Sequence, residues 1–347
     1  MKSKNLSEKI LRSVKSKGFK YIELPSVIEA NHIVQRSGEN FRKFMFSFTD
    51  INGKELCLRP DLTIASCLRY LEGNFKGKEK IFYSGQAYRK VESKRDKIIR
   101  NQVGFEILGS KDEKNDDKEI INTSIKILQD FKFSSGTLTI GNIEIFNLLI
   151  SKLDIPKRWK LRLSRHFWRE EYFNDLLKRL ETNADIDPTI VEIDKKRYLD
   201  LLNKNPETMI AGRSVGEILK RFDTKIKDPR QAKRGNKVSK IIKSFLKISC
   251  PINKAAMELN KFFKKNKINL VVDQRYFPIS SNKLSKLNVK FSTSFGRHLE
   301  YYSGMVFKID VKSKSTIIKC AGGRYDRLIS DLGSKKEVPA VGAAFNL

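Results

Sequence analysis

The feature that most constrains this fold is a helical block that interrupts β-rich sequence. Residues 20–110 alternate short runs of β-branched and aromatic residues with turn signals, and similar runs return after about residue 266. Between about 151 and 265, apolar residues recur every three or four positions and glycine is sparse. That spacing is typical of amphipathic helices. We therefore expect one mixed sheet built from residues 1–150 and 266–347, with a helical insertion at 151–265.

Local patterns predict individual elements within this outline. The Asp50-Ile51-Asn52-Gly53 stretch separates two β-rich runs and predicts a hairpin. Apolar residues at helical spacing predict a helix over 117–131, and we expect a strand leading into a helix over 136–150. Further strands are expected at 80–90, 101–110, 268–278, 299–311 and 315–323.

The composition excludes several classes of protein. No apolar run approaches the ~18–20 residues of a membrane span, and the N-terminus lacks the apolar core of a secretory signal. The four cysteines form no C-x-x-C pair and the three histidines are scattered singly, so no zinc site is predicted. We expect free thiols, no metal, no cofactor and a cytoplasmic protein.

The net charge of +30 leaves two interpretations open. A basic protein is a candidate for nucleic-acid binding, and residues 220–247 form a candidate basic patch. However, lysines outnumber arginines by about two to one along the whole length, which is typical of a genome-wide bias towards A-rich codons. An RNA groove more often clusters arginine with aromatic residues. We therefore favour codon bias, and tRNA is not an expected partner.

Four short stretches carry side chains suited to binding a small zwitterion. Carboxylates hold ammonium or imidazole groups, and arginines hold carboxylates or phosphates. On a strand, Gln102 and Glu106 would share one face, as would Glu300 and Tyr302, with Tyr301 opposite. The candidate pocket residues are Asp61, Thr63, Arg89, Gln102, Glu106, Arg297 and Tyr302.

Glu106 is the most informative of these residues. A strand-end arginine is usually solvated or ion-paired, and a glutamate usually faces solvent. Glu106, however, lies among Val103, Phe105, Ile107 and Leu108 in an apolar strand. A buried carboxylate is costly unless a cation or a hydrogen-bond donor accompanies it. The sequence therefore predicts a partner for Glu106 inside the fold.

In this order, the stretches resemble the catalytic core of the class II aminoacyl-tRNA synthetases, specifically the histidyl-tRNA synthetase family. Residues 18–30 resemble the dimer-forming first motif, with Pro25 as its proline. Residues 83–110 resemble the second motif, 295–307 the histidine-recognition signature, and 321–345 the approach to the third motif. The resemblance implies an α+β fold with a mixed, mainly antiparallel sheet flanked by helices.

Departures from the family pattern fall on the ATP side of the site. Val91 stands where the family has a glutamate beside the adenine, and Asn346 replaces a glycine. The sequence ends before the arginine that clamps ATP in the family and before an anticodon-binding domain. Loss of one charge-stabilising donor costs about 3–4 kcal/mol. The resemblance therefore implies that adenylation is disabled.

The amino-acid side of the site is largely kept, and the resemblance implies roles around a bound histidine. The residues implied to face its ammonium group are Asp61, Thr63 and Gln102. Those implied to face its imidazole are Glu106 and Tyr302, and those implied to face its carboxylate are Arg89 and Arg297. Asp61 replaces the usual glutamate and His298 the usual glycine, so the pocket is altered.

This combination resembles the family of regulatory subunits of ATP phosphoribosyltransferase, the first enzyme of histidine biosynthesis. The resemblance implies a subunit without catalysis of its own that assembles with the short-form catalytic subunit in a hetero-oligomer. It also implies a homodimer through the first motif, with free histidine as a candidate feedback ligand. Two alternatives stay open: a truncated histidyl-tRNA synthetase or amino-acid-activating paralogue, and a tRNA-binding module.

Overall fold

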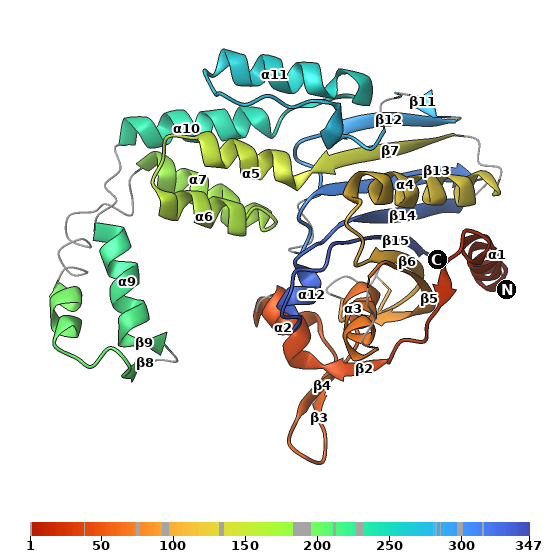
Figure 1. The fold of residues 1–347 in the computed structure, drawn as a ribbon, viewed down its shortest axis with the longest axis horizontal. Coiled ribbons are helices and arrows are strands. Elements are labelled where there is room, and N and C mark those ends of the chain that lie inside the picture. The colour runs from red at the N-terminus through yellow and green to blue at the C-terminus, as the bar shows by residue number, and fades with distance from the viewer. Residues whose placement is uncertain are drawn as a thin grey trace. The chain divides into compact units, whose positions relative to one another are not determined.

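The chain divides into two compact units (Figure 1). The computed structural model describes residues 2–37, 39–73, 77–91, 97–131, 135–182, 196–210, 213–226, 232–279, 281, 283–284, 286–296, 301–313 and 316–347. The first unit, here called the core, comprises Met1–Glu144, Ser249–Glu258 and Val272–Leu347. The helical unit comprises Ile145–Ile248 and Leu259–Val271.

A ten-stranded sheet dominates the described part of the core. In spatial order its strands are β1 (Lys20–Tyr21), β5 (Glu79–Tyr88), β6 (Ile99–Leu108), β15 (Ala340–Asn346), β14 (Thr316–Arg324), β13 (Met305–Ser313), β7 (Ser135–Asn142), β12 (Leu287–Ser292) and β10 (Ser249–Pro251), with β11 (Lys283–Leu284) beside β12. All neighbours from β5 to β7 are antiparallel, whereas β1–β5 and β7–β12 are parallel. The expected mixed, mainly antiparallel sheet is confirmed.

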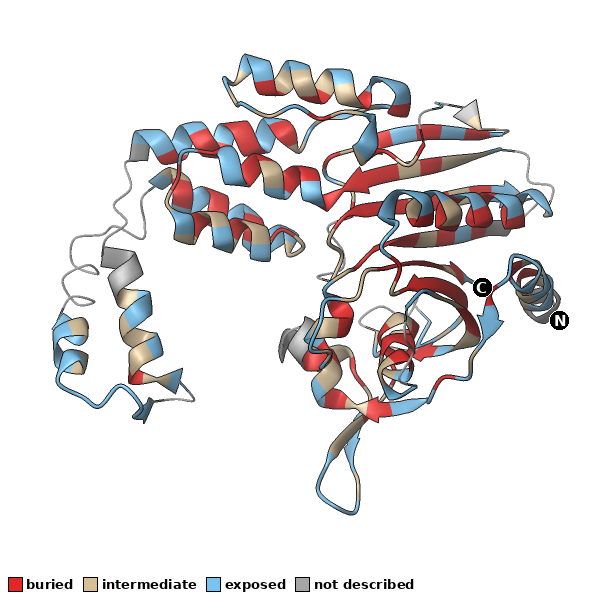
Figure 2. Cartoon of the chain, in the orientation of Figure 1, coloured by how far each residue is buried: buried red, intermediate tan, exposed pale blue. Residues whose placement is uncertain are grey.

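Two helices of the core pack on this sheet. Figure 1 shows α4 (Glu113–Gln129) lying across β13 and β14, and α1 (Lys2–Lys15) lies beside β5 and β6. The helix predicted over 117–131 is thereby confirmed, because α4 buries Ile120, Ile121 and Leu128. Buried residues run along the central strands in Figure 2. The apolar 340–346 segment is a central strand, which explains its lack of charged residues.

The described part of the core also contains a small three-stranded sheet. In spatial order its strands are β2 (Val27–Glu29), β4 (Glu55–Leu58) and β3 (Ser47–Thr49). Along the chain, β2 is followed by the helix α2 (Ala30–Ser37) and the 3₁₀ helix η1 (Glu39–Phe44), and β4 is followed by the helix α3 (Leu62–Glu72). The predicted hairpin is confirmed: Gly53 has a φ of 78° and donates its N–H to the Asp50 carbonyl at 3.1 Å. The expectation that 20–110 holds only strands and turns is wrong at α2 and α3.

The described part of the helical unit consists mainly of α-helices. It contains α6 (Lys157–Arg165), α7 (Glu170–Thr182), β8 (Met209–Ile210), β9 (Arg213–Ser214), α9 (Val215–Ile226) and α10 (Ala232–Phe245). It also contains most of α5 (Ile143–Lys152) and α11 (Ala255–Lys265), whose first residues belong to the core. A cluster of aromatic rings fills its interior, with Phe146 stacked on Phe167 at 3.7 Å and edge-on to Phe173 at 5.8 Å. Ring stacking of this kind adds to the free energy of apolar burial.

The strand expected at 268–278 is wrong. Residues 268–273 have no regular structure, and Gln274–Tyr276 form a short 3₁₀ helix, η4. The backbone hydrogen bonds here are local, as in Ile268 N–H to the Phe263 carbonyl and Tyr276 N–H to the Asp273 carbonyl. The sheet position beside β7 is taken instead by β12. The apolar residues of this segment therefore did not decide its structure, since strand formation depends on the pairing partners that the fold supplies.

Within the described ranges, no helix is both long and apolar enough to cross a bilayer.

Candidate functional site

A small cavity lies against the central strands β6, β15 and β14 of the core. Its volume is about 180 Å³, which is below the range of about 300–1,000 Å³ typical of sites for drug-sized ligands. It therefore suits a ligand smaller than a drug-sized molecule, such as a single amino acid. Six of the predicted pocket residues line it: Asp61, Thr63, Arg89, Gln102, Glu106 and Tyr302. Arg297, the seventh, lies outside the described residues, as do His298 and Glu300.

Glu106 is buried on β6, with 1% of its surface exposed, and among the described residues its hydrogen-bond partners are all hydroxyl groups. Its Oε1 accepts hydrogen bonds from the Tyr83 hydroxyl at 2.5 Å and from Thr63 Oγ1 at 3.3 Å. Its Oε2 accepts one from the Tyr325 hydroxyl at 2.6 Å. A carboxylate offers about four acceptor positions. The predicted partner therefore exists, and acceptor capacity remains for a ligand N–H group.

Burial raises the pKa of Glu106 to about 7. The hydrogen bonds from Tyr325, Tyr83 and Thr63 oppose this rise because they stabilise the charged form, while the nearby Asp61 adds to it. Burial likewise raises the pKa of the Tyr83 and Tyr325 hydroxyls, so both stay protonated donors. With a pKa near neutral pH, Glu106 would shift to its ionised form when a cationic ligand binds beside it.

Two glycines make room for this network. Gly342 on β15 is paired with Glu106 on β6, and a Cβ atom at Gly342 would lie 1.2 Å from Glu106 Oε2. Gly104 is paired with Tyr83 on β5, and a Cβ there would lie 2.5 Å from the tyrosine ring. Both side chains therefore lean over a neighbouring strand that carries no side chain at that point.

Asp61 and Thr63 reach the cavity because the chain turns into α3. Asp61 is the N-cap of α3, and its Oδ1 accepts the N–H of Ile64 at 3.0 Å. Its Oδ2 accepts a hydrogen bond from the Tyr301 hydroxyl at 3.4 Å and lies 3.8 Å from Arg89 Nη2. The Asp61 carboxylate is therefore anchored on one oxygen and turned towards the cavity with the other.

Arg89 and Gln102 complete the polar wall. The Arg89 Nε donates to the Pro60 carbonyl at 2.8 Å, and its guanidinium lies 5.5 Å from the centre of the Phe41 ring. Gln102 Nε2 donates to Asn346 Oδ1 at 2.7 Å. Arg89 is thus fixed at its Nε while its outer nitrogens face the cavity, and Gln102 joins β6 to β15.

The tyrosine pair departs from the expected strand geometry. Strand β13 begins only at Met305, so the strand expected from residue 299 is too long, and Tyr301 and Tyr302 lie in the turn before it. Both line the cavity, and their rings are 5.1 Å apart. The prediction that Tyr301 faces away from Tyr302 is therefore wrong, because the alternation of strand side chains does not apply to a turn.

Several lining residues were missed in the sequence. These are Tyr83, which lies behind Glu106, and the cavity residues Arg100, Tyr301, Tyr325 and Asn346. The available signal was the glycines, since a glycine inside a strand often marks a close approach by another group. Gly104 and Gly342 meet that description in otherwise apolar strands.

The arrangement suits recognition of a small molecule with both charges. Two carboxylates, Asp61 and Glu106, can accept N–H groups, and Arg89 and Arg100 can hold an anionic group. As for metal ions, no three His, Cys, Asp or Glu side chains come together in the described residues.

Fold and site together define a synthetase-like core. Over 98% of this chain, a solved histidyl-tRNA synthetase from Nostoc sp. superposes with a TM-score of 0.59 at 16% identity, covering 68% of that protein. A Bacillus halodurans structure described as an ATP phosphoribosyltransferase regulatory subunit/histidyl-tRNA synthetase superposes with a TM-score of 0.57 at 21% identity, over 99% of this chain and 76% of that one. These likenesses confirm the expected fold.

The histidyl-tRNA synthetase family profile matches residues 1–347, and the chain belongs to that family. Among curated relatives, the ATP phosphoribosyltransferase regulatory subunit of Agrobacterium fabrum is 27% identical over 92% of this chain and 89% of its own length. The regulatory subunit of the same name from Allorhizobium ampelinum is also 27% identical, over 96% of this chain and 93% of the relative.

Proposed function

We propose that this chain is a regulatory subunit of ATP phosphoribosyltransferase, acting in the first step of histidine biosynthesis without catalysis of its own. The observation that carries the proposal is similarity along nearly the full length to relatives named as such subunits, at 27% identity over 92% and 96% of this chain. Similarity of that extent includes both the sheet and the helical unit, so it is not confined to one shared motif.

The cavity supports a role in sensing rather than in synthesis. On the side expected to bind the amino acid, the two carboxylates of Asp61 and Glu106 are held by hydrogen bonds from neighbouring groups. On the side expected to bind ATP, Val91 follows β5 at the position where the family has a glutamate. There the side-chain oxygen of Asn346 accepts a hydrogen bond from Gln102. A pocket that holds histidine without activating it can couple ligand binding to a partner's activity.

The proposal extends to partners and organisation. The short-form catalytic subunit would be the principal partner, and the first-motif stretch around Pro25 would form a two-fold homodimer whose remaining surfaces are available to it. Residues 1–150 and 266–347 would form the binding core, and 151–265 an inserted helical domain. The complex would operate in the cytoplasm.

Assembly and activation test this proposal. The two purified proteins are mixed at micromolar concentration and analysed by size-exclusion chromatography with light scattering, and the catalytic subunit's rate is measured with and without this chain. We expect one hetero-oligomer and a raised rate. Separate elution together with an unchanged rate would show that the chain is not a regulatory subunit.

Synthetase activity is tested separately. We expect no histidine-dependent exchange of pyrophosphate into ATP, because Val91 cannot replace the glutamate beside adenine. Exchange at about 1 s⁻¹ or faster, a rate typical of a working enzyme, would instead identify the chain as an amino-acid-activating enzyme.

A further inference from the structure

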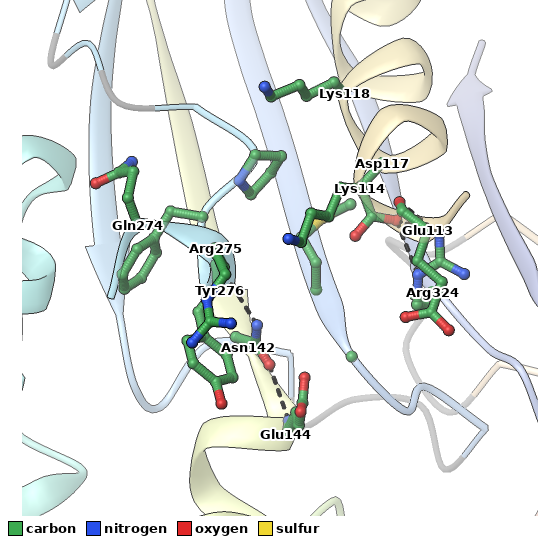
Figure 3. A pocket seen from close by; sticks show the side chains of 14 residues that line it. Glu113, Lys114, Asp117, Lys118, Asn142, Glu144, Gln274, Arg275, Tyr276 and Arg324 are labelled. Carbon is green, nitrogen blue, oxygen red and sulfur yellow. Dashed lines mark hydrogen bonds and ion pairs between the residues drawn. The ribbon is translucent and has the colours of Figure 1, made fainter. Parts of the chain in front are cut away.

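Asp117 and Arg324 form an ion pair on one face of the central sheet. Arg324 Nη2 donates to Asp117 Oδ1 at 2.7 Å, and Figure 3 shows the pair in the wall of a cavity beside α4. The residue before Arg324 on β14 is Gly323, where a Cβ atom would meet the ring of Tyr302 at 2.9 Å. Gly323 therefore faces the side of the sheet that holds Glu106. Because successive strand residues face opposite sides, the ion pair lies on the face away from Glu106.

Glu106 has no cation of this kind. Asp116, another carboxylate with 1% of its surface exposed, does have one, since its Oδ1 lies 2.6 Å from Lys78 Nζ. Within the described part of the chain, Glu106 forms no ion pair, and its hydrogen bonds come from three hydroxyl groups. An ionised carboxylate is costly to bury without a cation. Until a ligand binds, the cavity therefore favours a protonated Glu106.

A shell of hydroxyl groups can serve Glu106 in both protonation states. When the carboxylate is ionised, it accepts hydrogen bonds from Thr63, Tyr83 and Tyr325. Each hydroxyl oxygen also carries lone pairs, so it can accept the proton of a neutral carboxyl group. A lysine or an arginine in the same place could only donate. The shell therefore lets Glu106 gain or lose a proton without leaving a buried polar group unsatisfied.

The other titratable side chains described beside Glu106 are acids, and none supplies a positive charge. They are Asp61 and Cys67 on α3, Tyr83 on β5, Tyr301 and Tyr302 before β13, and Tyr325 after β14. Burial raises the pKa of Cys67 and of the four tyrosines, so these groups stay neutral near pH 7. The negative charge of Asp61 opposes the ionisation of Glu106.

The two arginines described in the wall of the cavity are placed beside other groups. Arg89 Nη2 lies 3.8 Å from Asp61 Oδ2, so part of its charge is offset there. Arg100 is six residues from Glu106 on β6, which separates their Cα atoms by about 20 Å along the strand. A cation for Glu106 can instead be supplied by a ligand.

We propose that Glu106 holds a proton until a ligand binds, and then passes that proton to a basic ring nitrogen of the ligand. This inference rests on the proposed function, in which the ligand is histidine. The O–H bond of the carboxyl group breaks as an N–H bond forms at the lone pair of the imidazole, which leaves a carboxylate–imidazolium ion pair and needs no other reactant. The cavity thereby selects a weak base over a ring of the same size that cannot be protonated.

The basicities of the two partners are matched for this transfer. Burial raises the pKa of Glu106 to about 7, and an imidazole side chain has a pKa of about 6.5. At low pH both free partners carry a proton, at high pH neither does, and the complex carries one. Binding should therefore release a proton below the midpoint of the two pKa values, about pH 6.8, and take one up above it. The affinity should be greatest near this midpoint.

Calorimetric titration of the full chain with L-histidine counts these protons. Each titration is repeated in two buffers of different ionisation enthalpy, and the difference in heat gives the number exchanged. We expect release of about 0.7 proton at pH 6 and uptake of about 0.9 proton at pH 8. Exchange of the same sign at both pH values, no net exchange, or no saturable binding would overturn the inference. The assembly and activation assay measures neither quantity, so the regulatory-subunit proposal is judged separately.

The matched control ligand is triazolylalanine, which carries the same ammonium and carboxylate groups on a ring that is not protonated at pH 6. Without a basic ring nitrogen it cannot form the charged hydrogen bond. It should bind about tenfold more weakly than histidine at pH 6.8, and it should release no proton at pH 6. Release as large as that of histidine would mean that the ring is not the proton acceptor, and would contradict the inference.

Variants identify Glu106 as the group that exchanges the proton. Glu106→Gln should bind histidine about tenfold more weakly at pH 6.8, lose the uptake at pH 8 and keep the release at pH 6. Glu8→Gln, at an exposed position on α1, removes the same charge and should change none of these values. Tyr325→Phe removes a donor to the ionised form, so it should move the pH of zero exchange upward. Uptake at pH 8 that is equal in Glu106→Gln and the wild type would contradict the assignment.

Discussion

Glu106 and Asp117 are two largely buried carboxylates on opposite faces of the same sheet, and they are stabilised differently. Asp117 binds the guanidinium of Arg324, and burial raises its pKa to about 6 even though Arg324 opposes the rise. Within the described part of the chain Glu106 is hydrogen-bonded by hydroxyl groups and by no cation, and burial raises its pKa to about 7. A carboxylate with a permanent cation is a fixed structural element. One held by hydroxyls retains the capacity to respond to a cationic ligand.

The largest loss of stability should come from removing the Arg324 guanidinium. Arg324→Met leaves Asp117 and Asp326 without their cation, and removing one partner of a buried ion pair costs about 3–5 kcal/mol. Urea unfolding measures the loss, with the exposed Arg327→Met as the control. A loss of less than about 1 kcal/mol would mean that the ion pair is not structural.

The next effect concerns the pH dependence of stability. Because the folded-state pKa of Glu106 is above its ordinary value, the folded protein binds a proton that the unfolded chain releases between pH 4.5 and about 7. The free energy of unfolding should therefore fall by about 3 kcal/mol as pH rises through that window. Glu106→Gln should lack this fall, while the change due to Asp117 stays in both proteins. Parallel curves for the two proteins would contradict the assigned pKa.

Gly342→Ala tests the close approach of Glu106 to β15. The new methyl group would overlap Glu106 Oε2, so the carboxylate must leave Tyr325 or the strands must separate. We expect a loss of about 1–3 kcal/mol. In a Glu106→Ala background the same substitution should cost much less, since the overlapping atoms are gone. Additive losses in the double variant would show that the two residues do not interact.

The smallest effects separate the hydroxyl partners of Glu106. Tyr83→Phe removes a bond of 2.5 Å to a charged acceptor and should cost about 1.5 kcal/mol. Thr63→Val removes a longer bond of 3.3 Å and should cost less. Both should raise the Glu106 pKa further, because each donor stabilises the ionised form. Thermal and urea unfolding at pH 8 measure the difference, and a reversed order would mean that Thr63 is the principal donor.

The sequence predicted the parts of this comparison that depend on local pattern. The apolar neighbours of Glu106 indicated a buried carboxylate, and helical spacing located α4. The sequence did not identify Tyr83 or Tyr325 as the donors, because their meeting with Glu106 depends on the register of β5 and β15 against β6. For the same reason the segment 268–278 was misjudged: its apolar residues suit a strand, but the position beside β7 belongs to β12.

Helix α3 shows a different limit. Asp61 and Thr63 lie at a helix N-terminus, within a region whose sequence predicted only strands and turns. The residues that follow, from Leu62 to Glu72, have apolar spacing that fits a helix, yet the strong β signals on both sides dominated the prediction. The candidate residues were identified nonetheless, because their chemistry does not depend on which element presents them.

The central claim is that the hydroxyl-held Glu106 responds to a bound ligand that regulates a partner. Histidine inhibition of the assembled complex with the catalytic subunit tests it directly, using wild-type chain, Glu106→Gln and, as control, Glu8→Gln. The account predicts that Glu106→Gln raises the inhibitory histidine concentration about tenfold or more while the complex still forms. Unchanged inhibition in an intact Glu106→Gln complex would contradict it and locate histidine sensing elsewhere.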